Sequence, residues 1–136
     1  MLSKLFIFSA LIIQSCGSGK SKPQLSSFEW TVVSINGTSN FSKKPTIIFS
    51  VKDETFSGNG GCNNFGGRFT LKGNKISFGQ VVSTKMYCKN IDTEDRFFST
   101  IETVDSYKVE NDMLVLFNKS NEVVMRLAQA SGEKNQ

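Results

Sequence analysis

Cysteine is the most reactive residue type in this sequence, and the chain contains three: Cys16, Cys62 and Cys88. The chain has no histidine, which is the commonest general base and the commonest metal ligand in proteins. The two cysteines outside the N-terminal region make a thin ligand set for a metal ion when no histidine accompanies them. We therefore predict no metal site, no cofactor and no catalytic activity.

Four side chains remain as candidates for acid–base chemistry, and these are Asp92, Glu94, Asp95 and Lys85. The three acids are spaced as in the first turn of a helix, where carboxylates cap free N–H groups and complement the helix dipole. We prefer this structural interpretation. An enzyme would instead need an acid pair with strongly raised pKa values in a closed cleft.

The N-terminus has the pattern of an export signal. Lys4 supplies the positive charge, and a mainly apolar stretch follows at residues 5–13. Nine residues span only ~14 Å as a helix, whereas the hydrocarbon core of a membrane is ~30 Å thick. We predict that residues 1–15 are a signal peptide rather than a membrane-spanning segment.

The segment Ile13-Gln14-Ser15-Cys16 resembles a lipobox, in which the cysteine takes a diacylglycerol and the signal peptidase cuts before it. We expect lipid attachment (palmitate) at Cys16, with residues 16–24 as a flexible tether to the membrane. Because Gly17 stands where an aspartate would favour the inner membrane, we expect outer-membrane anchoring on the periplasmic face. The alternative is an ordinary secretory signal with an incidental cysteine.

Cys62 and Cys88 form an even pair once Cys16 is assigned to lipid. In an oxidising compartment such a pair favours a disulfide. It would close a loop of ~26 residues and stabilise the fold by roughly 3–4 kcal/mol in the chain-entropy model. The alternative is two buried free thiols.

The elements that must position these residues are short strands and one helix. Phe97, Phe98, Ile101 and Val104 recur at helical spacing, which predicts an amphipathic helix over about 92–105. Alternating, β-branched and aromatic patterns predict strands, with turns at Asn36-Gly37 and Gly73-Asn74. The predicted strands are 28–35, 46–51, 55–58, 68–71, 75–78, an extended segment at 81–86, 107–109, 113–117 and 123–127.

Short connections between these strands favour antiparallel pairing. The fold class is therefore mainly β (α+β), a small curled antiparallel sheet or β-barrel-like domain with one helix. We place this domain at residues 25–130, followed by a disordered tail at 131–136. The glycine-rich run at 58–67 lacks the spacing of a phosphate-binding loop and fits a bulged, tightly turning strand better.

The distribution of basic residues argues against nucleic acid as a partner. The chain carries a formal charge of +4, and its basic residues are scattered rather than clustered. Proteins that bind nucleic acids usually present a clustered basic face. We predict no nucleic-acid binding.

Several motifs occur in an order that resembles a known family. They are Trp30, Ile35-Asn36-Gly37, Gly60-Gly61-Cys62-Asn63-Asn64-Phe65-Gly66-Gly67, Ser83-Thr84-Lys85-Met86-Tyr87-Cys88, Glu94 with Phe97-Phe98, and Leu114-Val115-Leu116. Together they are similar to the META domain, or HslJ-like heat-shock lipoprotein, family over about residues 25–128. The resemblance implies a small β-barrel-like fold with one helix, and envelope proteins linked to stress; it implies no catalysis.

One motif within this resemblance is a candidate structural or ligand-binding site. Its residues are Gly61, Cys62, Asn63, Asn64, Gly66, Thr84, Lys85 and Met86. We interpret it mainly as structural, because glycines allow a sharp bend and the two asparagines can satisfy backbone groups. A ligand or partner site in the same region is the alternative.

The function predicted from these observations is an envelope-anchored, non-catalytic binding or assembly module of the stress response. Its partner would be the membrane, through the lipid, together with a hydrophobic ligand or a peptide of another envelope protein. One alternative is a structural stress lipoprotein with no specific ligand. Another is an inhibitor of a hydrolase, by analogy of fold alone.

Overall fold

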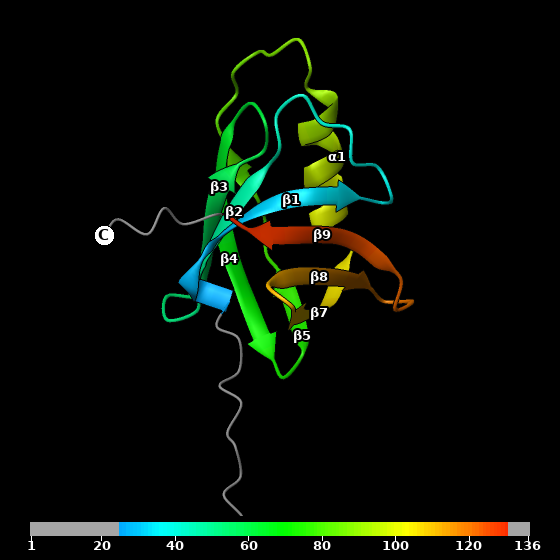
Figure 1. The fold of residues 1–136 in the computed structure, drawn as a ribbon. Coiled ribbons are helices and arrows are strands. Elements are labelled where there is room, and N and C mark those ends of the chain that lie inside the picture. Colours follow the sequence, from blue (N-terminus) through cyan, green and yellow to red (C-terminus); the bar gives the residue numbers. More distant parts are fainter. Residues whose placement is uncertain (1–24, 131–136) are drawn as a thin grey trace, which may run out of the picture.

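A computed structural model describes residues 25–130 of the chain. The signal peptide, Cys16, the tether and the C-terminal tail predicted above lie outside the described residues. Within them, nine strands and one α-helix follow a short 3-10 turn (Figure 1). The elements are η1 (Leu25–Ser27), β1 (Glu29–Ile35), β2 (Thr46–Ser50), β3 (Thr55–Asn59), β4 (Asn64–Lys72), β5 (Lys75–Phe78), β6 (Val82–Ser83), α1 (Asp92–Ile101), β7 (Val104–Glu110), β8 (Met113–Asn118) and β9 (Val123–Gln129).

Eight of the strands close into an antiparallel barrel. The sheet runs in the order β3-β2-β1-β9-β8-β7-β5-β4, and pairing of β3 with β4 closes the circle. Figure 1 shows α1 standing beside this barrel next to β1. The predicted fold class, a small mainly-β barrel with one helix, is confirmed. No helix within residues 25–130 has the length and hydropathy to cross a membrane.

Two-residue turns reverse the chain after β1 and between β4 and β5. Asn36 and Gly37 both have positive φ (46° and 80°), and the flanking Ile35 and Thr38 exchange backbone hydrogen bonds of 2.9 Å. Gly73 also has positive φ (62°) within the β4–β5 hairpin. Both turns were predicted from sequence, because asparagine and glycine tolerate the left-handed region that such hairpin turns require.

β5 and β6 together act as one strand that contains a bulge. Phe78 of β5 pairs with Phe69, whereas Val82 of β6 pairs with Gly66. The chain advances four residues on the β5–β6 side for three on β4, so one extra residue lies between them. A bulge of this kind bends the strand and increases its twist. It directs the segment after Val82 toward α1.

Apolar side chains fill the interior of the barrel. The core includes Trp30, Val32, Ile35, Ile47, Phe49, Phe56, Phe65, Phe69, Ile76, Leu114, Leu116, Met125 and Leu127. The buried face of α1 contributes Phe97 and Ile101, and the ring of Phe97 lies 5.2 Å from that of Phe65. The amphipathic stripe of the helix is therefore packed into the core, as its spacing predicted.

The helix is shorter than the sequence pattern predicted. It ends at Ile101 rather than near residue 105, and the last apolar residue of the pattern, Val104, begins β7. Thr103 turns the chain by donating both its N–H and its hydroxyl to the carbonyl of Thr100, at 3.0 and 2.7 Å. An apolar residue at position 104 can be buried from either a helix or a strand. Its spacing therefore could not show which of these elements it belongs to.

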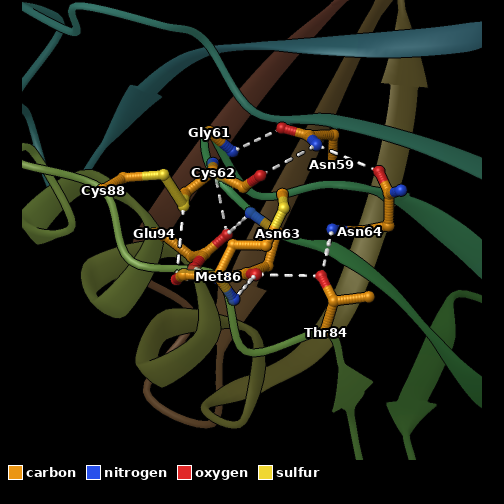
Figure 2. Close-up of a disulfide and its surroundings, with 9 residues drawn as sticks. All are labelled: Asn59, Gly61, Cys62, Asn63, Asn64, Thr84, Met86, Cys88 and Glu94. Atoms are coloured by element: carbon orange, nitrogen blue, oxygen red, sulfur yellow. Dashed lines mark hydrogen bonds between the residues drawn. A yellow bond between two sulfur atoms is a disulfide. The ribbon is translucent and has the colours of Figure 1, made fainter.

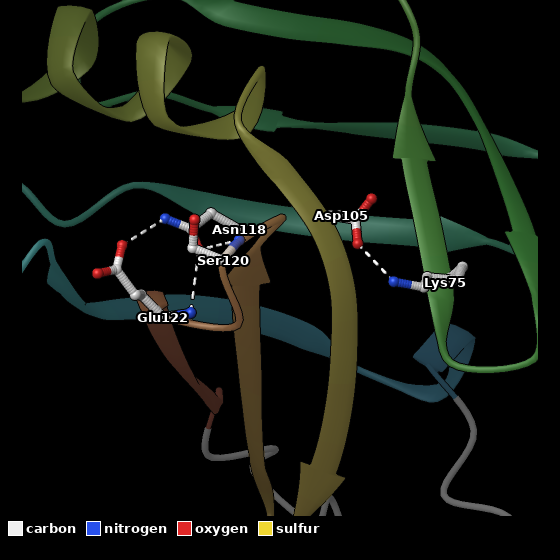
Figure 3. A network of polar contacts seen from close by, with 5 residues as sticks. All are labelled: Lys75, Asp105, Asn118, Ser120 and Glu122. Atoms are coloured by element: carbon white, nitrogen blue, oxygen red, sulfur yellow. Dashed lines mark hydrogen bonds and ion pairs between the residues drawn. The ribbon is translucent and has the colours of Figure 1, made fainter.

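Polar contacts reinforce the joints of the barrel. β5 and β7 share the single register pair Lys75 with Ser106, and Lys75 Nζ lies 2.6 Å from Asp105 Oδ2 across the same joint (Figure 3). In the β8–β9 turn, Asn118 Oδ1 accepts the N–H groups of Ser120 and Glu122, both at 3.0 Å (Figure 3). These contacts fix turns and joints rather than forming a site.

Candidate functional site

The loop between β3 and β4 is shaped by glycine and by one asparagine. Gly61 has a φ of +115°, a conformation that side chains with Cβ rarely adopt. Asn59, at the end of β3, accepts the N–H of Gly61 on Oδ1 at 2.9 Å, and the N–H of Gly60 donates to the carbonyl of Asn63 at 2.9 Å. The loop therefore turns tightly, with Cys62 and Asn63 at its inner side, both buried.

A disulfide joins this loop to the segment that precedes α1. Cys62 and Cys88 are bonded, with Cα atoms 6.1 Å apart and a sequence separation of 26 residues (Figure 2). The predicted pairing is therefore present. It links the β3–β4 loop to the stretch between β6 and α1. The strand pairing of β6 ends at Ser83, so the disulfide holds a part of the chain that this pairing does not reach.

Glu94 of α1 is buried against the same loop, with 3% of its surface exposed. Its Oε1 accepts the N–H groups of Cys62 and Asn63 at 3.3 and 2.5 Å, and its Oε2 accepts Asn63 Nδ2 at 2.7 Å (Figure 2). Hydrogen bonds to a charged acceptor are stronger than neutral ones, and a buried carboxylate needs them. Glu94 thus ties the helix to the loop.

Gly60 is required by the position of that carboxylate. A Cβ at Gly60 would lie 2.7 Å from Oε1 of Glu94 and 2.8 Å from its Cγ. Contacts this short do not occur with real Cβ atoms, so only glycine fits beside the glutamate. The glycine-rich character of the loop therefore has a packing cause as well as a conformational one.

The side-chain amide of Asn63 extends the pairing of β4 and β6 by bonding to the backbone of Met86. Oδ1 accepts the N–H of Met86 at 2.6 Å, and Nδ2 donates to the carbonyl of Met86 at 3.3 Å. Oδ1 also accepts the hydroxyl of Thr84 at 2.9 Å. Asn63 is 4% exposed, and both its donors and its acceptor are used (Figure 2). It fixes the course of the chain beyond β6.

The other residues of the predicted motif lie around this network. Asn64 is exposed; its N–H donates to Thr84 Oγ1 at 3.2 Å, and its Oδ1 accepts the side chain of Asn59 at 3.0 Å. Gly66, within β4, pairs with Val82 of β6. Lys85 is exposed on the segment after β6. The structure therefore brings the whole predicted motif together on one side of the barrel.

A groove of about 310 Å³ lies between this segment and α1. One wall is the stretch from Ser83 to Tyr87, and the other is the helix side, which includes Ile91, Asp95 and Phe98. Three apolar side chains beside the groove are strongly exposed: Val82 at 68%, Met86 at 57% and Tyr87 at 92%. They are the three most exposed large hydrophobic side chains among residues 25–130, and they lie within six consecutive positions.

A second groove, of about 490 Å³, lies at the start of α1. Its lining is mainly polar and comprises Thr38, Asn40, Phe41, Ser42, Asn90, Asp92, Thr93 and Arg96. It contains none of the motif residues. We therefore regard the groove beside β6 as the candidate site.

The comparison with protein families agrees with the order of these motifs. The family model of the META domain matches residues 23–131, which is most of the chain. The chain belongs to the META domain family.

Solved structures of the same shape are known for distant proteins. An NMR structure of a protein from Burkholderia xenovorans is similar to this META domain with a TM-score of 0.62 and 20% identity, covering 79% of this chain and 84% of that one. A crystal structure of a DUF4847 family protein from Bacteroides vulgatus has a TM-score of 0.58 and 16% identity, covering 78% and 94%. At these identities the likeness shows the fold alone. None of the curated proteins matches the chain.

The acid–base candidates of the META domain lie in different surroundings, although Lys85, Glu94 and Asp95 all line the groove beside β6. Asp92 and Asp95 are exposed in the first turn of α1, whereas Glu94 is buried with both oxygens bonded to the loop. No side chain caps α1, whose N-cap position is Ile91, so the capping expectation is wrong for all three acids; they do lie in the first turn, where a negative charge complements the helix dipole. Within residues 25–130, no group of three or more metal-ligating side chains comes together.

Sequence reasoning missed two contributors to the site. Asn59 was not singled out, although an asparagine two residues before a glycine N–H at a strand end is a known turn signal. The sequence patterns mark Glu94 as a helix acid, an acid–base candidate and part of the family resemblance, but not as the acceptor of the loop. Its role as the buried acceptor of the loop depends on a contact across 31 and 32 residues of chain, which no local pattern reports.

Proposed function

We propose that this protein is a lipid-anchored, non-catalytic module of the cell envelope that binds a peptide of another envelope protein. The observation that carries this proposal is the groove beside β6, where exposed Met86 and Tyr87 stand on a segment of fixed conformation. Tyrosine and methionine are enriched where proteins bind one another. Binding of a partner would explain why these two side chains are exposed to solvent.

The conformation of this segment is fixed by the disulfide and by the contacts of one buried amide. The Cys62–Cys88 disulfide closes one end, the Asn63 amide pairs with Met86, and Thr84 donates to the same amide. A loop that is ordered before binding loses less conformational entropy when a partner docks. The buried polar network therefore supports binding as well as folding.

A peptide fits better than an acyl chain as the ligand. Trp30, Phe49 and Phe97 are among the fully buried side chains that fill the barrel, which leaves the interior occupied. The groove outside is lined partly by Lys85 and Asp95, and an acyl chain has no group that would complement these charges. A peptide supplies apolar and charged groups together.

The proposed anchor would attach at the end of the domain away from the groove. In Figure 1 the described chain begins at η1, toward the lower end of the molecule, and the connection between β6 and α1 forms the top. A lipid on Cys16, with residues 17–24 as a flexible tether, would leave that connection accessible to a partner. Radiolabelled palmitate tests the anchor: the Cys16→Ala variant would lose the label that the unaltered protein acquires.

Site-specific photo-crosslinking in living cells tests the function. A photoreactive amino acid at Tyr87 is expected to capture one envelope protein, whereas the same group at Lys119, in the β8–β9 turn, does not. The captured protein is then purified and titrated against the domain, and Tyr87→Ala is expected to weaken its binding by about tenfold. Equal capture at both positions, or equal affinity of the variant, would refute the proposal.

A further inference from the structure

β6 has a strand partner on one side only. Its residues pair with β4, and the N–H of Thr84 continues this ladder by donating to the carbonyl of Asn64 at 3.0 Å. The N–H of Met86 extends it once more by donating to Asn63 Oδ1. In an antiparallel ladder, alternate residues direct their backbone groups toward the partner strand. Because Thr84 and Met86 face β4, Ser83 and Lys85 face away from it.

The free edge opens into the groove. Ser83 and Lys85 both line it, and within residues 25–130 no other strand pairs with β6 on that side. The backbone N–H and C=O groups of two residues are therefore presented, in an extended and fixed conformation, to a space of about 310 Å³. Unpaired strand edges of this kind accept a further strand.

We propose that the ligand is an extended peptide segment that adds to the free edge of β6 as a further strand, between β6 and α1. This inference rests on the proposed function and specifies its binding mode. Main-chain hydrogen bonds to Ser83 and Lys85 give affinity, while alternate side chains of the peptide contact the walls of the groove. The helix side of the groove offers Phe98 to an apolar side chain.

The charges of the groove select the peptide further. Lys85 lines the strand wall and Asp95 lines the helix wall, and both are exposed. A complementary segment carries an acidic residue toward Lys85 and a basic one toward Asp95, with an apolar residue between. Opposite charges across paired strands stabilise only weakly and mainly set register and orientation.

The opposite wall excludes a second copy of the domain as occupant. α1 stands beside the free edge, so the groove admits a single extended chain. The β6 edge of another folded copy has its own α1 beside it and cannot approach. An edge with such a wall accepts an unfolded or terminal segment of a partner rather than a complete sheet.

Peptide selection followed by hydrogen exchange tests the binding mode. Random dodecapeptides displayed on phage are selected against the protein, and an enriched peptide is synthesised and titrated. On binding, the Ser83 and Lys85 amides are expected to exchange at least about tenfold more slowly, since they acquire hydrogen bonds. The Thr84 amide, already bonded to β4, is expected to change little.

A proline at the edge supplies a matched pair of variants. Proline removes an N–H but is tolerated on strand edges, so Lys85→Pro is expected to fold and to weaken peptide binding by about tenfold or more. Lys85→Ala keeps the N–H and is expected to weaken it by no more than about threefold. The Thr84 amide signal reports whether either variant has disturbed the β4–β6 ladder.

The outcomes separate this mode from the function itself. Failure to enrich any peptide, protection elsewhere than at Ser83 and Lys85, or equal affinity of both Lys85 variants would each overturn strand addition. If crosslinking at Tyr87 still captures a specific envelope protein, the binding function stands and only its mode is wrong. If crosslinking fails as well, both proposals are refuted.

Discussion

The side-chain amide of Asn63 pairs with both backbone groups of Met86, a residue 23 positions further along the chain. The amide thereby takes the place of a backbone residue in the sheet, and it does so beside a disulfide and a buried glutamate. One side chain thus links the β3–β4 loop, α1 and the segment that borders the groove.

Replacing Asn63 by alanine is expected to release the segment after β6. The Met86 N–H would lose its acceptor and the Thr84 hydroxyl would lose its partner. We expect faster amide exchange at Met86 and Tyr87, with the β1 and β9 amides unchanged, as measured by NMR. Asn64→Ala is the control, since Asn64 is exposed and its side chain hydrogen-bonds Asn59 rather than Met86. Unaltered exchange at Met86 in Asn63→Ala would contradict this role.

Removing the Glu94 carboxylate is expected to destabilise the fold. In Glu94→Ala three buried donors lose their acceptor, which costs about 3 kcal/mol or more in unfolding free energy. Glu94→Gln is expected to cost about 1–2 kcal/mol, because its amide N–H₂ would face the N–H₂ of Asn63. Urea unfolding measures both, with Asp95→Asn as the exposed control, expected within about 0.5 kcal/mol of the unaltered protein. A Glu94→Ala variant as stable as this control would show that the carboxylate is dispensable.

Removal of the disulfide is expected to lower the unfolding free energy by roughly 3–4 kcal/mol, the chain-entropy value for a loop of this length. The Cys62→Ala/Cys88→Ala variant should melt at a lower temperature than the unaltered protein. Adding dithiothreitol should lower the melting temperature of the unaltered protein toward that of the variant and leave the variant unchanged. If reductant has no effect on the unaltered protein, the bond does not form in solution.

Gly60 and Gly73 are expected to respond differently to alanine. At Gly60 a Cβ would overlap the Glu94 carboxylate, so Gly60→Ala should destabilise by about 2–3 kcal/mol and disturb the loop. At Gly73 there is open space and only the positive φ is unfavourable, so Gly73→Ala should cost about 1 kcal/mol. Thermal unfolding compares them, and a smaller loss at Gly60 than at Gly73 would contradict the packing argument.

Local chemistry allowed much of the fold to be predicted from sequence. The Asn36-Gly37 and Gly73-Asn74 turns, the alternation of buried residues along β1 and the helical stripe of Phe97 and Ile101 are short-range patterns. Each pattern involves only residues that lie a few positions apart in the sequence. The barrel class followed because antiparallel strands with short connections must curl or pair to satisfy their edges.

The parts that could not be predicted depend on long-range contacts. The start of β4 at Asn64 lies within a glycine run of low strand propensity, and its pairing on both sides overrides that propensity. The end of α1 depends on where β7 finds its partner β8. The groove requires β6 to lack a neighbour, and only the closed topology shows this.

The most direct test of the account is the affinity of the selected peptide for two asparagine variants. If the buried network orders the binding segment, Asn63→Ala should bind about tenfold more weakly than the unaltered protein, while Asn64→Ala binds almost as well. Circular dichroism and the melting transition verify that both variants are folded at the temperature used. A folded Asn63→Ala protein that binds the peptide with undiminished affinity would contradict the central claim.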